Sequence, residues 1–153
     1  MIRLFFVFII GFFIQFLLYG ALPFENLKID LLLIITISSA VTQGSLVGEV
    51  TGFFSGIIED ITTMGIFGGK SLIRIIIGYF SGKLKGRIME SSVFFQIALV
   101  FVMFIISGFA GILIQIIYSY PSISIKQVFI NAIVNALISP AVFWAIGGRR
   151  IVR

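Results

Sequence analysis

Apolar residues fill most of this chain in six runs, which short polar or glycine-rich segments separate. Long runs with few charges are typical of helices that lie in a membrane. The pattern predicts an all-α fold of six helices, at residues 4–22, 30–42, 45–61, 69–84, 92–118 and 125–147. The clearest of these is the fifth, because residues 93–117 include no charged side chain.

The middle of the chain, residues 31–84, allows two interpretations. Three short helices there would each be about 20–25 Å long, which is less than the roughly 30 Å of a hydrocarbon core. If residues 31–61 formed a single helix instead, it would be about 46 Å long and would need a steep tilt.

The basic residues favour the first interpretation. They cluster at Arg3, at residues 83–87 and at residues 149–153. Three crossings in the middle of the chain place all three clusters on one side, whereas two crossings would separate them, against the positive-inside rule. We therefore expect one transmembrane domain, residues 1–153, with six crossings of the bacterial cytoplasmic membrane and both termini in the cytoplasm.

The composition agrees with a membrane protein. Of the 153 residues, 59% are hydrophobic and 11% are charged, whereas soluble domains have about 25% charged residues. The chain has no cysteine and no histidine, which excludes disulfides and sites built on thiolate or imidazole ligands. We therefore expect no cofactor. We also expect no nucleic-acid partner, because the net charge of +5 lies at the ends of the apolar runs and indicates orientation in the lipid bilayer.

Glycines recur at every fourth position along the third predicted helix, at Gly44, Gly48, Gly52 and Gly56. The fourth predicted helix has a matching series that includes Gly78 and Gly82. Glycines at this spacing make a smooth ridge against which another backbone can pack closely. Since a short loop joins the two helices, we expect them to be antiparallel, with the two ridges in contact.

Four charged residues flank the loop between these two helices: Glu59, Asp60, Lys70 and Arg74. A charge within a membrane costs about 2.5 kcal/mol or more at the centre, so we expect the two acids and two bases to form an ion cluster. The cluster would pin the helix pair, relay a state or contact a partner, or bind a ligand or ion.

Asn131 and Asn135 are four residues apart and share one face of the sixth predicted helix. Two interpretations remain open for this polar face. The amides form hydrogen bonds between helices, which average only about 0.6 kcal/mol each in a membrane, or they line a binding cavity.

Several of these features in their order along the chain resemble the MreD family of bacterial rod shape-determining membrane proteins. The matching features are Asp30-Leu31-Leu32, the glycine ridge with Asp60, Phe67-Gly68, Gly78-Tyr79, Asn131 with Asn135, and Pro140. Lys70 departs from the small or amide residue expected after the Phe-Gly pair. The resemblance covers about residues 25–150.

The resemblance implies a compact helical bundle similar to the substrate-binding S components of energy-coupling-factor transporters. It also implies an MreC-type single-span partner and, through that partner, MreB filaments, RodA and a class B penicillin-binding protein. We therefore expect a non-catalytic scaffold of the cell-elongation complex, which regulates cell shape and peptidoglycan synthesis. The alternative is the S component of a vitamin transporter. An enzyme is not expected, because no nucleophile in the chain has a recognisable base.

Overall fold

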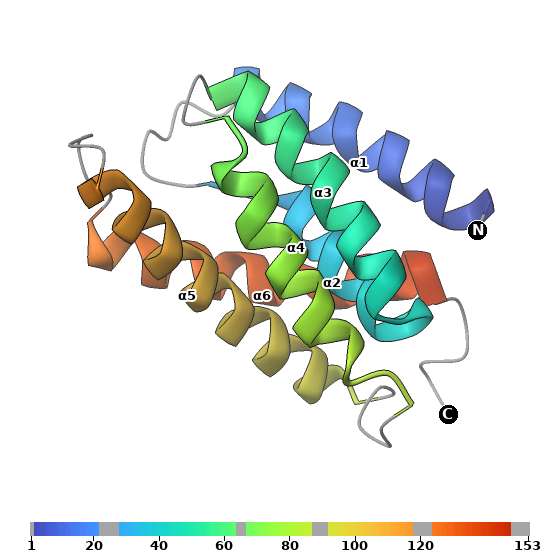
Figure 1. The fold of residues 1–153 in the computed structure, drawn as a ribbon. Helices are drawn as coiled ribbons and strands as arrows, with labels where there is room; N and C mark the ends of the chain where they lie inside the picture. The colour runs from blue at the N-terminus through green and yellow to red at the C-terminus, as the bar shows by residue number, and fades with distance from the viewer. Residues whose placement is uncertain (1, 22–27, 64–66, 87–91, 118–123, 148–153) are drawn as a thin grey trace.

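The computed structural model describes residues 2–21, 28–63, 67–86, 92–117 and 124–147, which form six helices and no strand (Figure 1). The helices are α1 (Ile2–Ala21), α2 (Leu31–Gln43), α3 (Ser45–Thr63), α4 (Gly69–Gly82), α5 (Val93–Ile117) and α6 (Ile125–Gly147). The predicted all-α class and the six helices are confirmed, and each boundary lies within two residues of its predicted position. The basic cluster at residues 149–153, for which a cytoplasmic position is predicted, lies outside the described residues.

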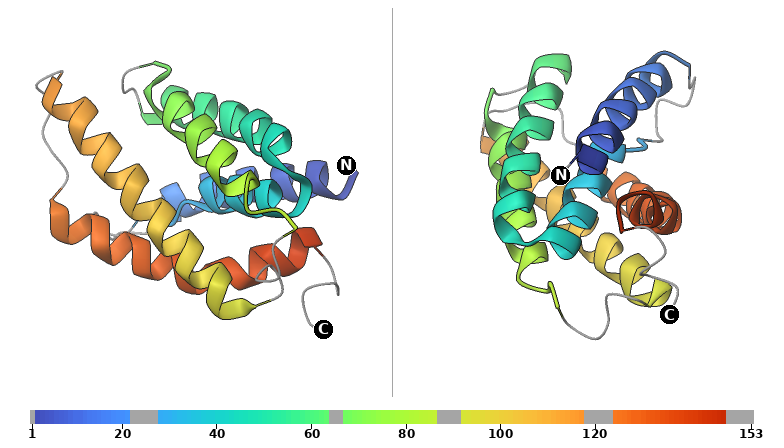
Figure 2. Two further views of the ribbon diagram at one scale, coloured as in Figure 1. Left: turned by 60° about the horizontal axis from the view of Figure 1, so that its bottom comes forward. Right: turned by 90° about the vertical axis from the view of Figure 1, so that its right-hand side faces the viewer.

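The short helix α2 is the centre of the molecule. It packs against α1, α3, α4 and α6, and its residues 32–41 are all buried. Both views in Figure 2 show it enclosed by these neighbours. A helix of 13 residues is only about 20 Å long, and this length suffices because α2 is surrounded by protein.

The five outer helices expose large apolar side chains, whereas α2 exposes none. Examples are Phe5 on α1, Phe54 on α3, Phe80 on α4, Phe94 on α5 and Trp144 on α6. Apolar exposure on this scale marks a surface that contacts lipid or another protein. The main core lies inside this shell, where α2 meets α4, α5 and α6.

Helices α3 and α4 lie side by side along the seam that their glycines form (Figure 1). A methyl group added to Gly52 would lie 2.5 Å from the carbonyl oxygen of Arg74, and one added to Gly48 would lie 2.6 Å from that of Gly78. Added methyl groups at Gly56 and Gly82 would clash with the backbones at Ser71 and Ser45. The two backbones therefore approach too closely for any side chain between them.

Gly44 lies at the end of this seam, where a methyl group added to Gly82 would lie 2.8 Å from the carbonyl carbon of Gly44. It lies between α2 and α3 with a φ of +111°, a conformation that residues with a side chain rarely adopt. Its N–H donates to the carbonyl oxygen of Ala40 at 2.8 Å and ends α2. Gly44 therefore also makes the turn that reverses the chain at this end of the seam.

Within the described residues, two helices are long and apolar enough to cross a membrane, α5 and α6. Shorter apolar stretches occur at residues 2–18 and in α2. Helix α4 has only 14 residues, and α3 includes Glu49, Glu59 and Asp60. The apolar lengths therefore indicate a membrane protein, and the crossings by the other four helices remain a prediction.

Candidate functional site

A polar network surrounds the start of α2, where residues 28–31 enter the bundle. The N–H of Asp30 donates to Asn135 Oδ1 at 2.8 Å, and the N–H of Leu31 donates to Gln15 Oε1 at 2.7 Å. Asp30 also caps its own helix, since its Oδ1 accepts from the N–H of Leu33 at 2.9 Å. Side chains of α1 and α6 thus bind the backbone N–H groups that a helix start leaves without a helical partner.

The two asparagines of α6 both bind the segment before α2. Asn131 Oδ1 accepts from the N–H of Lys28 at 3.0 Å, and Asn135 Nδ2 donates to the carbonyl oxygen of Lys28 at 2.8 Å. Asn135 is completely buried. The polar face predicted for this helix therefore holds a distant chain segment in place.

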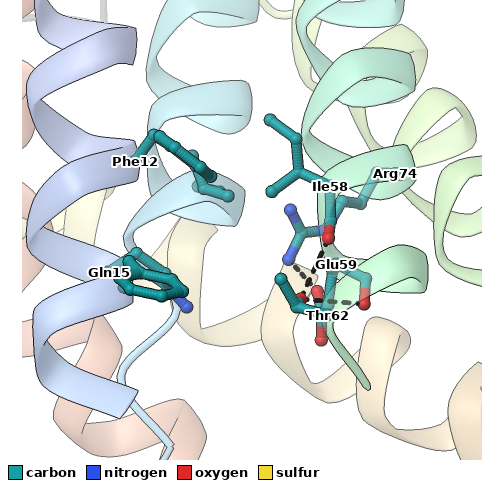
Figure 3. Close-up of a pocket in the computed structure, with 8 residues that line it drawn as sticks. Phe12, Gln15, Ile58, Glu59, Thr62 and Arg74 are labelled. Atoms are coloured by element: carbon teal, nitrogen blue, oxygen red, sulfur yellow. Dashed lines mark hydrogen bonds and ion pairs between the residues drawn. The ribbon is translucent and has the colours of Figure 1, made fainter. Parts of the chain in front are cut away.

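Arg74 is the central charge of the network, and it is only 1% exposed. Its Nη2 donates to Asp30 Oδ2 at 2.6 Å and also to Glu59 Oε2. Glu59 Oε1 lies 3.5 Å from Lys70 Nζ. The ion pairs form a continuous series, Asp30–Arg74–Glu59–Lys70, that links the start of α2 to α3 and α4. Figure 3 shows its central pair, Arg74 and Glu59.

The formal charges of these four residues cancel, since two of them are acids and two are bases. Removal of charges from water is costly, and their mutual attraction compensates only when every charge has a partner. Loss of one member of a buried pair typically costs about 3–5 kcal/mol, because it leaves the other charge uncompensated. The network is therefore sensitive to the loss of any central member.

Asp60 plays a different part from the one that the sequence pattern predicts. Among the described residues it forms no ion pair with Lys70 or Arg74. Its carboxylate accepts from the N–H groups of Gly68, Lys70 and Ser71 at 2.9, 3.0 and 3.3 Å. Ser71 Oγ also donates to it, at 3.2 Å.

These contacts make Asp60 the cap of α4. Gly68, the residue at the N-cap position, has no side chain with which to bind the free N–H groups. A carboxylate at a helix start also interacts favourably with the helix dipole. Asp60 of α3 thus supplies the cap that the local sequence of α4 lacks.

A small pocket beside the network has a volume of about 10 Å³ and is lined by Phe12, Gln15, Glu59 and Arg74, among others (Figure 3). That volume is just sufficient for one water molecule. Protein thus packs closely around Glu59 and Arg74, and this pocket is too small for an organic ligand.

Two members of the network are not evident in the sequence. Gln15 is an isolated amide in an apolar helix, and Asp30 is part of the Asp30-Leu31-Leu32 feature, which gives no indication of an ion pair. Asp30 and Arg74 are 44 residues apart. Because no local spacing relates residues at such separations, only the fold brings these groups together.

Comparison with known proteins gives the identity of the family. The model of the family "rod shape-determining protein MreD" matches residues 1–146, which is nearly the whole chain. Searches of curated proteins and of solved structures returned no match, so the predicted likeness to transporter S components remains a prediction. The match covers the whole polar network and all six helices except the last residue of α6, and the chain belongs to the MreD family of rod shape-determining proteins.

Proposed function

We propose that this protein is a non-catalytic membrane scaffold of the cell-elongation machinery, which binds an MreC-type single-span protein. The observation that carries the proposal is the family match over residues 1–146. Through that partner the scaffold acts on MreB filaments, RodA and a class B penicillin-binding protein. It thereby regulates where peptidoglycan is made and so the shape of the cell.

A scaffold is also supported by the way its charged groups are used. Asp30, Glu59 and Arg74 hold one another in ion pairs, and Asp60 caps a helix. Groups so engaged connect helices to each other. They are poorly suited to proton transfer, which needs a group within reach of a substrate.

The proposed topology has six crossings of the cytoplasmic membrane with both termini in the cytoplasm. It is supported by alternation of the helices between the two ends of the bundle (Figure 1) and by the position of Lys83 and Lys85 just after α4. The polar network then lies at the outer end of the bundle. Its central members are buried among helices, where lipid does not reach them.

The partner is expected to bind through the outward faces of the helices, because these faces carry the large exposed apolar side chains. A rigid bundle presents such faces in fixed positions. The ion pairs and the amide contacts around α2 connect α1, α2, α3, α4 and α6, so they are expected to keep those faces in register.

The direct test is co-purification from native membranes. An affinity-tagged chain is expressed at its normal level, the membranes are solubilised in mild detergent, and the MreC-type protein is quantified in the eluate. We expect recovery at about one copy per chain, with an unrelated polytopic protein bearing the same tag as the control. Absence of the MreC-type protein from the eluate, together with normal cell shape after depletion of the chain, would contradict the proposal.

Topology is tested separately by labelling single cysteines, for which the natural chain provides a background free of cysteine. A cysteine at Lys28 is expected to react with an impermeant reagent added to intact cells, and one at Lys85 is expected to react only after the cells are opened. The reverse pattern would contradict the proposed orientation and would leave the test of the partner unaffected.

A further inference from the structure

An apolar groove runs along the molecule between α1 and α6, with α2 as its floor. Its volume is about 470 Å³, and it is open to the surface. One wall is a single face of α1, which includes Val7, Ile14 and Leu18, and the other is a face of α6 with Ala141 and Ala145. Every residue that lines the groove is apolar.

The groove exists because its walls consist in part of small residues and because α1 packs mainly against α2 and makes little contact with α6. Gly11 lets α1 approach α2 closely, since an added methyl group would clash with Ile35 Cδ1. On the opposite wall, alanines stand where larger side chains would fill the space. An open apolar groove in a membrane is filled by hydrocarbon, because water gains no hydrogen bonds there.

The dimensions of the groove fit a lipid chain. It extends from Val7 to Leu18, which is about 16 Å along the helix, close to half of a hydrocarbon core of about 30 Å. A cavity of about 150 Å³ holds one benzene ring, so about 470 Å³ corresponds to roughly 18 carbon atoms. A partner helix is about 10–12 Å wide and crosses both leaflets, so it would not be matched by this half-length groove.

A cation lies at one end of the groove. Arg3 is one helical turn before Val7 on the same face of α1, and its Nη2 lies 3.4 Å from the carbonyl oxygen of Trp144, beside Ala145. Arg3 is exposed, and a guanidinium has five N–H donors. Among the described residues the guanidinium contacts the Trp144 carbonyl group through Nη2, which leaves donors for a phosphate group, and guanidinium groups bind phosphate well.

We propose that the groove between α1 and α6 is a specific phospholipid site, with one acyl chain between the two helices and the headgroup phosphate at Arg3. In the proposed orientation the lipid belongs to the cytoplasmic leaflet. The site would make one lipid molecule part of the bundle, closing the gap that α1 and α6 leave. This inference does not depend on the MreC-type partner.

The test is retention of lipid by the purified full-length protein. The protein is extracted from bacterial membranes in mild detergent without added lipid, and bound phospholipid is quantified by native mass spectrometry and by phosphate analysis. We expect about one phospholipid per chain for the natural protein, and at least a fivefold loss for Ala141→Phe, which places a ring in the groove. The matched control is Ala98→Phe, an exposed alanine on α5 outside the groove, which should retain lipid normally.

Arg3→Gln tests the headgroup contact and is expected to lower retention two- to fivefold while the protein remains folded. If Ala141→Phe does not fold, the smaller change Ala145→Leu replaces it. Retention equal to that of the natural protein in a folded groove variant would overturn the site, and normal retention in Arg3→Gln would overturn the headgroup assignment. A photo-crosslinker at position 141 that labels a protein helix or a second copy of this chain would also overturn the proposal.

Discussion

Two pairs of consecutive helices, α3–α4 and α5–α6, solve the same packing problem in opposite ways. In the first pair glycines bring the backbones together, so that Gly48 meets the carbonyl group of Gly78 and Gly52 meets that of Arg74. In the second pair contact is made by side chains, as where Gly108 faces the side chain of Val128. The helices α5 and α6 cross at an angle and separate toward their joined ends (Figure 2).

Charge follows the same division. Residues Glu59, Asp60, Lys70 and Arg74 are all in α3 and α4, whereas α5 has no charged residue and α6 has Lys126 near its start. The tight glycine seam and the four charged residues thus occur on the same pair of helices. Because the backbones touch, ionic groups on the two helices reach each other and lie shielded from lipid, which the open α5–α6 pair could not provide.

The largest effect is expected from Arg74→Leu, which leaves Asp30 and Glu59 without their shared cation. The free energy of unfolding should fall by about 3–5 kcal/mol, measured by titration with a denaturing detergent in mixed micelles. The triple variant Arg74→Leu, Glu59→Gln, Asp30→Asn should recover part of the loss, because it removes the uncompensated charges. The exposed Lys83→Leu serves as the control, and a loss for Lys83→Leu as large as that for Arg74→Leu would refute the assignment.

The same substitution at two glycines should have effects of opposite sign. Gly52→Ala forces a methyl group against the backbone of α4 and should cost about 1–3 kcal/mol. Gly111→Ala lies in α5 with no atom within 4 Å of the new methyl group, so it should stabilise the protein by up to about 1 kcal/mol through helix propensity. Equal changes in the unfolding free energy would show that the seam is not as tight as the glycines indicate.

Asp60→Ala removes the acceptor for three backbone N–H groups at the start of α4 and should cost about 0.5–2 kcal/mol, as losses of helix caps do. Asp60→Asn keeps one oxygen acceptor, so its cost should be intermediate. Amide hydrogen exchange adds a local measurement, since Lys70 and Ser71 should exchange faster in the alanine variant. Faster exchange throughout the bundle would instead indicate a global role for Asp60.

The smallest effects are expected in α6. Asn131→Ala should cost only about 0.6 kcal/mol, the average for a hydrogen bond between membrane helices. Asn135→Ala should cost more, since Asn135 is fully buried and binds both the N–H of Asp30 and the carbonyl oxygen of Lys28. Thermal unfolding in detergent compares the two variants directly, and the reverse ranking would contradict the proposed role of Asn135.

The helices and the glycine seam were accessible from the sequence because both leave local signals. Apolar runs end at glycine or polar residues, and a four-residue spacing fixes which glycines share a face. The spacing did not reveal that Gly44 also makes a turn, because a four-residue period carries no information about a positive φ. It also placed Asp60 among the ion pairs, since sequence distance cannot distinguish a carboxylate facing a guanidinium from one facing backbone N–H groups.

The contacts around Asp30 could not be predicted in the same way. Its partners Arg74 and Asn135 come from two other helices, at separations of 44 and 105 residues, and Gln15 of a third helix binds the N–H of the next residue, Leu31. No periodicity within one helix encodes such a meeting. What the sequence does show is the low number of charged residues, which indicates that each acid or base in the bundle needs a partner.

The same long separations set an order for biosynthesis. The ribosome makes α2 early, but Asn135 emerges only 105 residues after Asp30, which is roughly 5–20 s later at about 5–20 residues per second. During that interval the start of α2 lacks its α6 partner. The Asp30 carboxylate likewise has no guanidinium partner until the ribosome has added the 44 residues up to Arg74. The nascent chain must therefore be sheltered by the insertion machinery until its last helix arrives, and truncation before α6 should expose it to quality-control proteolysis.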